Sequence, residues 1–182
     1  MKKITFFITV LLTGFAINLS AQSSGSATAT VNAKLIKAMT LTESTQLNFG
    51  SNLLPNASGG TVVLPSNSTA RTYDGNGGVV AAAVGPAVNG AYAVTGTAGE
   101  SYALTLPTAS FDVTHTTVNT GVNTMTVTSM LARFNNAGGD ATTSTLAQDG
   151  TDSFTLGATL TVGNGQKAGI YAGTFPISVD YN

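Results

Sequence analysis

The feature that most constrains this chain is an alternation of apolar and polar residues with period two, which recurs from end to end. Side chains of a β-strand point alternately to its two faces, so the pattern predicts strands with one buried face. No long stretch keeps the helical period of 3.6. The one weak helical candidate, residues 129–137, continues a strand pattern and is interpreted as a strand that ends in a loop. The chain is therefore expected to be all-β.

Turns rich in glycine and asparagine separate the apolar runs at a spacing of about ten residues. Both residue types readily adopt the positive φ values that tight connections need. This arrangement predicts an antiparallel β-sandwich of roughly 8–10 strands, because a closed barrel tends to show more even strand lengths. The expected strands are residues 27–35, 45–50, 61–65, 79–84, 91–96, 101–107, 111–115, 124–130, 153–162 and 171–182.

The first residues predict export. Two lysines precede an apolar run at residues 4–19, and the small Ala21 then precedes a polar QSSGS stretch. Residues 1–21 are therefore expected to be a signal peptide, and residues 22–182 a single domain. The apolar run is short for a membrane span, so no stable span is expected after cleavage. The expected location is the periplasm, the outer surface or the extracellular space.

Composition narrows the class of partner. Only 8% of the residues are charged, where a soluble domain usually has about 25%. After removal of residues 1–21, the chain has five basic and eight acidic residues, and neither kind forms a run. The resulting negative net charge argues against a nucleic-acid partner. A weakly charged surface suits self-association or packing with related surface subunits. A neutral secreted domain is the alternative.

The sequence offers little for catalysis or metal binding. It contains no cysteine and one histidine, His115, in strand phase with Phe111 and Val113. No nucleophile-elbow motif accompanies it, so we expect a structural histidine, no enzyme and no cofactor. No metal site is predicted, although calcium at the glycine-containing turns stays open as a weaker alternative. The acidic residues of those turns are Asp74, Asp149 and Asp152.

One loop is a candidate ligand contact. Arg71, Tyr73 and Asp74 stand beside a glycine-rich turn at residues 75–78. Binding residues are often carried by such loops, although a turn tyrosine at the solvent edge is the commoner situation.

The two ends of the exported chain carry complementary patterns. The last strand is expected to lie inside the sandwich, with discontinuous pairing at Pro176, which lacks an N–H. Its apolar residues are Tyr171, Phe175, Ile177, Val179 and Tyr181. Near the other end, a small-residue strand either folds back into its own domain or completes the sheet of a neighbouring copy. Its inward residues are Ala27, Ala29, Val31, Ala33 and Leu35.

An ordered set of motifs resembles the family of exported bacterial proteins called DUF4402. The motifs are LNFG at 47–50, GGTVVLP at 59–65, NGAYAVTGTAGESYALTLP at 89–107, FTLGATLTV at 154–162 and GIYAGTFPISVDYN at 169–182. That family is similar to spore-coat-U-like and fimbrial (pilin) subunits. The resemblance implies an immunoglobulin-like sandwich that lacks its last strand and receives the N-terminal extension of a neighbour. The chain differs from the commonest fimbrial pattern in having no cysteine pair and a short extension at residues 22–26.

The expected function is therefore a non-enzymatic structural subunit of a bacterial surface appendage or coat. In this hypothesis residues 27–35 supply a donor strand, and residues 171–181 line the groove that receives it. The alternative is a self-complete secreted or surface-attached module for binding or adhesion, whose turns at residues 71–78 or 135–140 contact a ligand.

Overall fold

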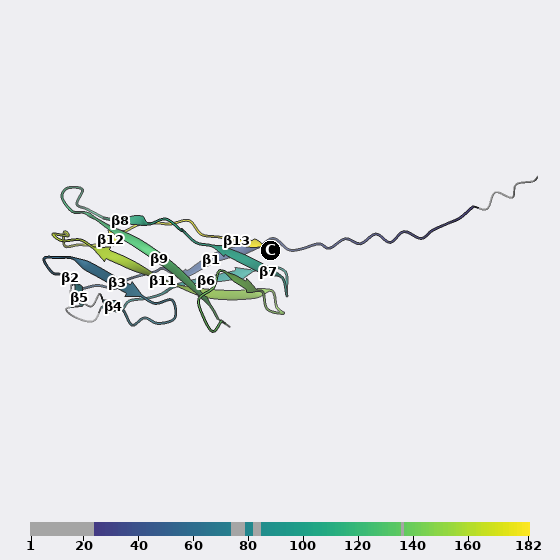
Figure 1. Cartoon of the computed structure of the whole chain (residues 1–182), viewed down its shortest axis with the longest axis horizontal. Helices are drawn as coiled ribbons and strands as arrows, with labels where there is room; N and C mark the ends of the chain where they lie inside the picture. The colour runs from purple at the N-terminus through teal and green to yellow at the C-terminus, as the bar shows by residue number, and fades with distance from the viewer. Residues whose placement is uncertain (1–23, 74–78, 82–84, 136) are drawn as a thin grey trace, which may run out of the picture. The chain divides into compact units, whose positions relative to one another are not determined.

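The computed structural model describes residues 24–73, 79–81, 85–135 and 137–182. The chain forms two units, Met1–Lys34 and Leu35–Asn182, and all strands of the described residues belong to the second unit (Figure 1). This domain contains no helix among those residues. The prediction of an all-β protein is confirmed. The predicted signal peptide lies outside the described residues.

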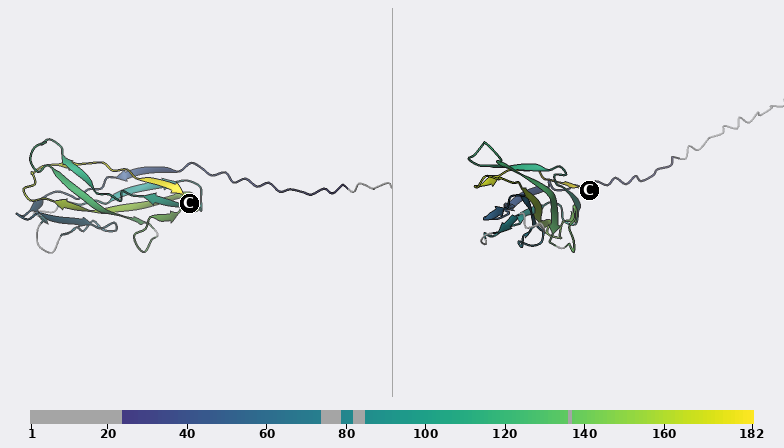
Figure 2. Two further views of the ribbon diagram at one scale, coloured as in Figure 1. Left: turned by 45° about the horizontal axis from the view of Figure 1, so that its top comes forward. Right: turned by 60° about the vertical axis from the view of Figure 1, so that its left-hand side comes forward.

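A large antiparallel sheet of eight strands forms the body of the domain. It curls strongly, like half of a barrel, as Figure 2 shows from two sides. The longest strand, β11, lies at its centre between β9 and two shorter strands, β6 and β3. In spatial order the strands are β1 (Thr40–Thr45), β6 (Gly90–Thr95), β11 (Thr151–Val162), β9 (Thr124–Phe134), β8 (Phe111–His115) and β12 (Tyr171–Ala172), with β3 (Gly60–Leu64) also on β11 and β4 (Thr72–Tyr73) on β3.

A second antiparallel sheet of three strands covers part of the large one. Its order is β10 (Thr143–Thr145), β7 (Ser101–Thr105) and β13 (Ser178–Tyr181). A separate two-stranded ribbon joins β2 (Leu53–Pro55) to β5 (Val79–Ala81). The described residues thus form 13 strands rather than the predicted 8–10. Several have only two or three residues, which is too short for an alternating pattern to show.

Near its middle, β11 changes partner on one edge. Its first half pairs with β6 as far as Leu156, and its second half pairs with β3 from Ala158 onward. Gly157 stands at the change, where a Cβ atom would clash with the backbone of Leu64, Pro65 and Ser66. The sheet can fork there only because this residue has no side chain.

The strands enclose two hydrophobic clusters. The closed cluster lies under the three-stranded sheet and includes Tyr92, Tyr102, Phe134, Phe154 and Leu156, all buried. Its rings pack with centroids 5.2 to 5.8 Å apart, a spacing typical of favourable aromatic pairs. The open cluster lies under the β8, β9 and β3 part of the large sheet and consists of Val62, Val127, Ala158, Leu160 and Val162. We call these two regions the closed half and the open half.

The first predicted strand is wrong. The structure assigns no strand to residues 24–39. Ala27, Ala29, Val31, Ala33 and Leu35 are all exposed, with Val31 at 91% and Leu35 at 97%. An alternating segment forms a strand only where a neighbouring strand edge pairs with it, and the structure assigns these residues to no strand ladder.

The last strand is divided rather than continuous. Tyr171 and Ala172 pair with β8 of the large sheet, whereas Ser178–Tyr181 pair with β7 of the small sheet. Residues 173–177 between them form no strand, which confirms the break expected at Pro176. Phe175, Ile177 and Val179 are half-buried, so this segment lies at the boundary of the core instead of inside it.

Candidate functional site

A groove of about 1350 Å³ opens over the open half of the domain. Its floor is formed by inward residues of the large sheet, among them Phe111, Val113, Met125, Val127 and Leu160. Residues 46–55 border one side and residues 166–177 the other. Small-molecule pockets usually measure roughly 300–1000 Å³, so a groove of this size favours a longer occupant.

The groove exists because the two sheets differ in length. β9 and β11 have 11 and 12 residues, which extend to roughly 36–40 Å at about 3.3 Å per residue. The covering strand β7 has 5 residues and its neighbours have fewer, so this layer reaches less than half as far. Apolar side chains of the large sheet beyond that point receive no second strand layer in the described chain.

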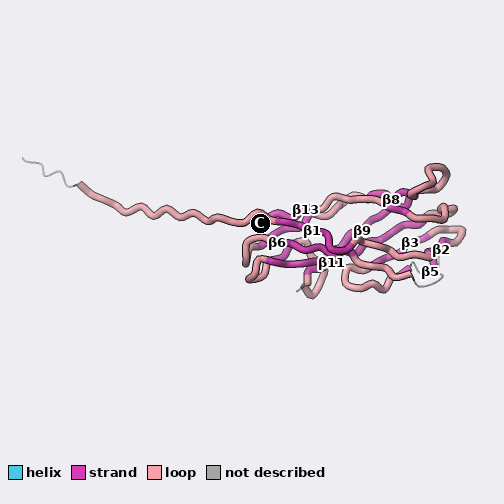
Figure 3. Tube along the Cα trace, turned by 180° about the vertical axis from the view of Figure 1, so that it is seen from behind, coloured by secondary structure: helices cyan, strands magenta, loops and turns pink. Residues whose placement is uncertain are grey.

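The C-terminal border is the stretch where the chain passes from one sheet to the other. Phe175 packs on Phe111 with ring centroids 5.2 Å apart, and both rings remain half-buried. Figure 3 draws this stretch as a loop between the strands of the two sheets. This border therefore combines apolar side chains with a backbone stretch, residues 173–177, that belongs to neither sheet.

The opposite border is held in place by Arg71. Its guanidinium donates to the carbonyl of Phe49 at 2.6 Å and to that of Gly85 at 3.0 Å, while Asn48 and Val88 exchange backbone hydrogen bonds at 2.8 Å. Two nitrogens of the Arg71 guanidinium thus join two loops, and its predicted ligand contact stays a prediction.

The other members of the predicted ligand loop are not brought together with a cavity. Tyr73 lies in β4, where it pairs with Val62 and packs half-buried against the open cluster. It is thus part of the core rather than a turn residue. Asp74 lies outside the described residues.

His115 lies beside the end of the groove that residues 166–170 line. We call this end, together with the adjoining loops at residues 116–123 and 163–170, the loop end. The Nδ1 atom of His115 accepts hydrogen bonds from the backbone N–H groups of Thr117 and Val118, at 3.2 and 3.0 Å. Because those groups can only donate, the ring proton is on Nε2, which donates to the carbonyl of Ala168 at 3.0 Å. The ring also packs edge-on against Tyr171 at 5.0 Å. This buried histidine therefore joins two loops, in the structural manner that the sequence predicts.

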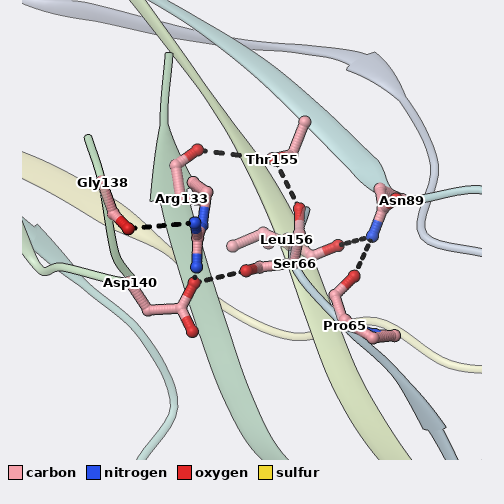
Figure 4. Close-up of polar contacts among 8 residues, drawn as sticks. All are labelled: Pro65, Ser66, Asn89, Arg133, Gly138, Asp140, Thr155 and Leu156. Carbon is pink, nitrogen blue, oxygen red and sulfur yellow. Dashed lines mark hydrogen bonds and ion pairs between the residues drawn. The ribbon is translucent and has the colours of Figure 1, made fainter. Parts of the chain in front are cut away.

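A polar cluster lies on the fork of the large sheet (Figure 4). Asp140 accepts hydrogen bonds from the Ser66 hydroxyl and from Arg133 Nε, the latter at 3.3 Å. Asn89 Nδ2 donates to Pro65 and Leu156 carbonyls at 2.6 and 3.0 Å, and Thr155 donates to the Ser66 carbonyl at 2.6 Å.

The cluster stabilises the place where strands separate. Its serine donates to a carboxylate that also forms an ion pair with Arg133, so these side chains join the segments that meet at the fork. Asp140 belongs to the turn that sequence analysis gave as a ligand contact, and its carboxylate is instead paired with Arg133.

The acidic turns considered for calcium use their oxygens internally. Asp149 accepts from the backbone and hydroxyl of Thr151, and these hydrogen bonds lower the pKa of its carboxyl. Asp152 accepts from the hydroxyls of Tyr102 and Ser144, at 2.9 and 2.6 Å. Across the described ranges, no three acidic or histidine side chains are grouped as a metal would require.

Comparison with known proteins gives one match. A family model described as Domain of unknown function (DUF4402) covers residues 39–181. The chain belongs to this family. No curated protein and no solved structure matches it. The DUF4402 match begins one residue before β1 and ends with the last residue of β13, so the segment 27–35 precedes the matched domain. No helix in the described part of the chain is long and apolar enough to cross a membrane.

Of the residues predicted to line a receiving groove, Tyr171, Phe175 and Ile177 border this one, whereas Val179 and Tyr181 do not. The floor of the groove was not predicted. Phe111, Val113 and Met125 were recognised only as inward residues of strands. Alternation shows which side chains face inward, but it does not show whether another layer covers them.

Proposed function

We propose that this protein is a non-enzymatic, exported structural subunit of a bacterial surface appendage or coat, in which a strand from a neighbouring copy fills the groove. The observation that carries the proposal is a match between two parts of one chain. The open half has a groove whose floor includes the half-buried Phe111, Val113 and Met125 and receives no second strand layer in the described chain. The segment 27–35 has an alternating apolar face that is exposed. Each part lacks what the other supplies.

Burial provides the driving force. Covering Val31 and Leu35 would contribute about 1.5–3 kcal/mol for each side chain, and backbone pairing along an edge adds to that gain. The half-buried Phe111 and Phe175 would lose further contact with water. In this proposal the domain is an immunoglobulin-like, pilin-like sandwich whose missing strand comes from outside the chain. The low content of charged residues favours packing between copies.

The test uses the exported full chain on a denaturing gel, with and without boiling. We expect a ladder of oligomers that collapses to one band only on heating, because buried strand pairing resists detergent until the domain unfolds. A single band in both lanes would contradict strand exchange and favour a self-complete binding or adhesion module instead.

Two matched variants distinguish the effect of the apolar face from the effect of an added charge. Val31→Asp places a carboxylate on the apolar face and should abolish the ladder, since an unpaired charge cannot be buried cheaply. Asn32→Asp adds the same charge on the opposite face and should leave the ladder intact. Equal behaviour of the two variants would exclude a face-specific insertion of residues 27–35.

A further inference from the structure

The large sheet ends at an unpaired edge beside the groove. β12 pairs with β8 through Tyr171 with His115 and Ala172 with Thr114. On its other side no strand lies among the described residues. Residues 169–175 run along this edge and line the groove. An edge of this kind accepts an additional strand through backbone hydrogen bonds.

The chain enters its own domain beside β13, away from the loop end, and we call this side of the domain the terminal end. Lys37 accepts a hydrogen bond from the Tyr181 hydroxyl at 2.9 Å and donates its N–H to Thr97 at 2.7 Å. Figure 1 shows β12 and β13 toward opposite ends of the domain. Residues 36–39 also line a small pocket with residues 179–181, so the chain's own backbone occupies the terminal end.

The position of this entry point decides whether a strand of a given direction in the groove belongs to the same chain or to a second copy. Leu35 is two residues from Lys37, a reach of about 7 Å at most. The Leu35 of the same chain therefore stays at the terminal end. A segment that places Leu35 at the loop end, beside Gly169, must come from a second copy.

Exposed apolar side chains favour entry from the loop end. Leu54 and Ile170 line the groove there and are 54% and 73% exposed, and Val122 in the adjoining loop is 45% exposed. A neighbour that inserts its segment from this side would cover them. Contact between two different surfaces repeats from copy to copy, and it builds an open filament where the rotation does not close into a ring.

Side-chain size then selects the register. For an antiparallel strand on the groove side of residues 169–175, one alignment places each large residue beside a small one, as good packing requires. The facing pairs are Leu35 with Gly169, Ala33 with Tyr171, Val31 with Gly173 and Ala29 with Phe175. A shift by two residues would place Leu35 against Tyr171 and Val31 against Phe175. A shift by one would turn the apolar face outward.

We propose that residues 29–35 of a second copy enter from the loop end and pair antiparallel with residues 169–175, with Val31 beside Gly173. This inference rests on the proposed function and specifies its partner, direction and register.

The absence of cysteine from the chain makes a disulfide test specific. In the proposed register Asn32 lies opposite Ala172, both exposed in the single copy. Facing positions on neighbouring strands bring Cα atoms within the roughly 4.4–6.8 Å that a disulfide needs. Asn32→Cys and Ala172→Cys are introduced on separate full-length chains that are co-exported and then oxidised.

We expect a reducible dimer of the two single variants, with a yield at least about fivefold above that of a control pair. The control joins Asn32→Cys with Thr174→Cys, which is exposed as well and would face Asn32 in the register shifted by two residues. The thermal midpoint of each single variant shows that the substitutions leave the fold intact.

Each other outcome overturns a defined statement. A heat-sensitive ladder with equal or better coupling to position 174, or with coupling to neither position, overturns the register while the proposed function stands. A chain that carries both Asn32→Cys and Ala172→Cys and gives a closed monomer without dimers overturns the second copy as donor. If the unsubstituted protein shows no ladder of oligomers on the unboiled gel, the proposed function itself is overturned.

Discussion

The closed and open halves of this domain are built on the same two long strands, and they differ most in what lies above them. In the closed half β9 and β11 face β7, β10 and β13, and Tyr102 and Leu156 are 0% exposed. In the open half the same large sheet presents Phe111 and Met125 to a groove. An alternating strand therefore makes a face that can be buried, while the length of the second layer decides how much of that face is covered.

Phe154→Ala should have the largest effect on the closed half. Phe154 is 1% exposed and packs on both Tyr92 and Phe134, so its loss leaves a cavity. We expect a decrease of about 3–5 kcal/mol in the free energy of unfolding, measured by chemical denaturation. A decrease below 1 kcal/mol would mean that the closed half is not the tightly packed part of the domain.

Gly157→Ala should have the next largest effect, because it acts at the boundary between the halves. The added Cβ would meet the backbone of Leu64, Pro65 and Ser66, which cannot rotate away as a side chain can. We expect a loss of about 1–3 kcal/mol by the same measurement. Gly99→Ala is not a clean control because its φ is +73°. Gly138→Ala is suitable, since nothing lies within 4 Å of its Cβ position, and it should cost little.

Tyr102→Phe should reveal a pH dependence of the closed half. Burial, and then the hydrogen bond to Asp152, raise the pKa of the Tyr102 phenol above its ordinary value of 10.0. The neutral phenol donates the hydrogen bond to Asp152. Its contribution to the free energy of unfolding is therefore present below pH 10 and is lost as the pH rises above 10. The variant should be about 1–2 kcal/mol less stable at pH 8, and this difference should shrink toward pH 11.

The measurement is urea unfolding of both proteins at several pH values. Tyr92→Phe should behave in the same way, because burial and Glu43 also raise the pKa of the Tyr92 phenol. A difference that stays constant from pH 8 to pH 11 would contradict the assignment.

The sequence was sufficient to predict which residues face the closed core. Tyr92, Val94, Tyr102 and Leu104 alternate in their strands, and the structure buries all four. The prediction worked because neighbouring strands of the same chain pair with those segments. The break at Pro176 was also predictable, since proline removes a backbone donor.

The fork and the open half could not be predicted by the same reasoning. Gly157 interrupts an alternating run without any sign in the pattern that β3 and β6 separate there. Ala27 to Leu35 alternate as regularly as any strand of the domain, yet the structure assigns them to no strand. Pairing depends on which edge is within reach, and a single sequence does not contain the geometry of that edge.

Phe111→Ala should have the smallest effect in a single copy and is the sharpest test of the difference between the halves. Phe111 is half-buried and has Phe175 as its ring partner, at 5.2 Å. In a variant that lacks residues 27–35 and stays monomeric, we expect Phe111→Ala to lower the free energy of unfolding by only about 1 kcal/mol. The effect is small because part of the ring is already exposed before unfolding.

In the full chain the same Phe111→Ala substitution should lower the temperature at which the oligomer ladder collapses by more than it lowers the unfolding temperature of the single-copy variant. The reason is that an inserted strand would bury the remainder of the ring. Phe154→Ala is the matched control, since its ring is already buried without a neighbour and its effect should be the same in both states. Equal shifts for Phe111→Ala in the two states would mean that the groove floor is not what a neighbouring copy covers.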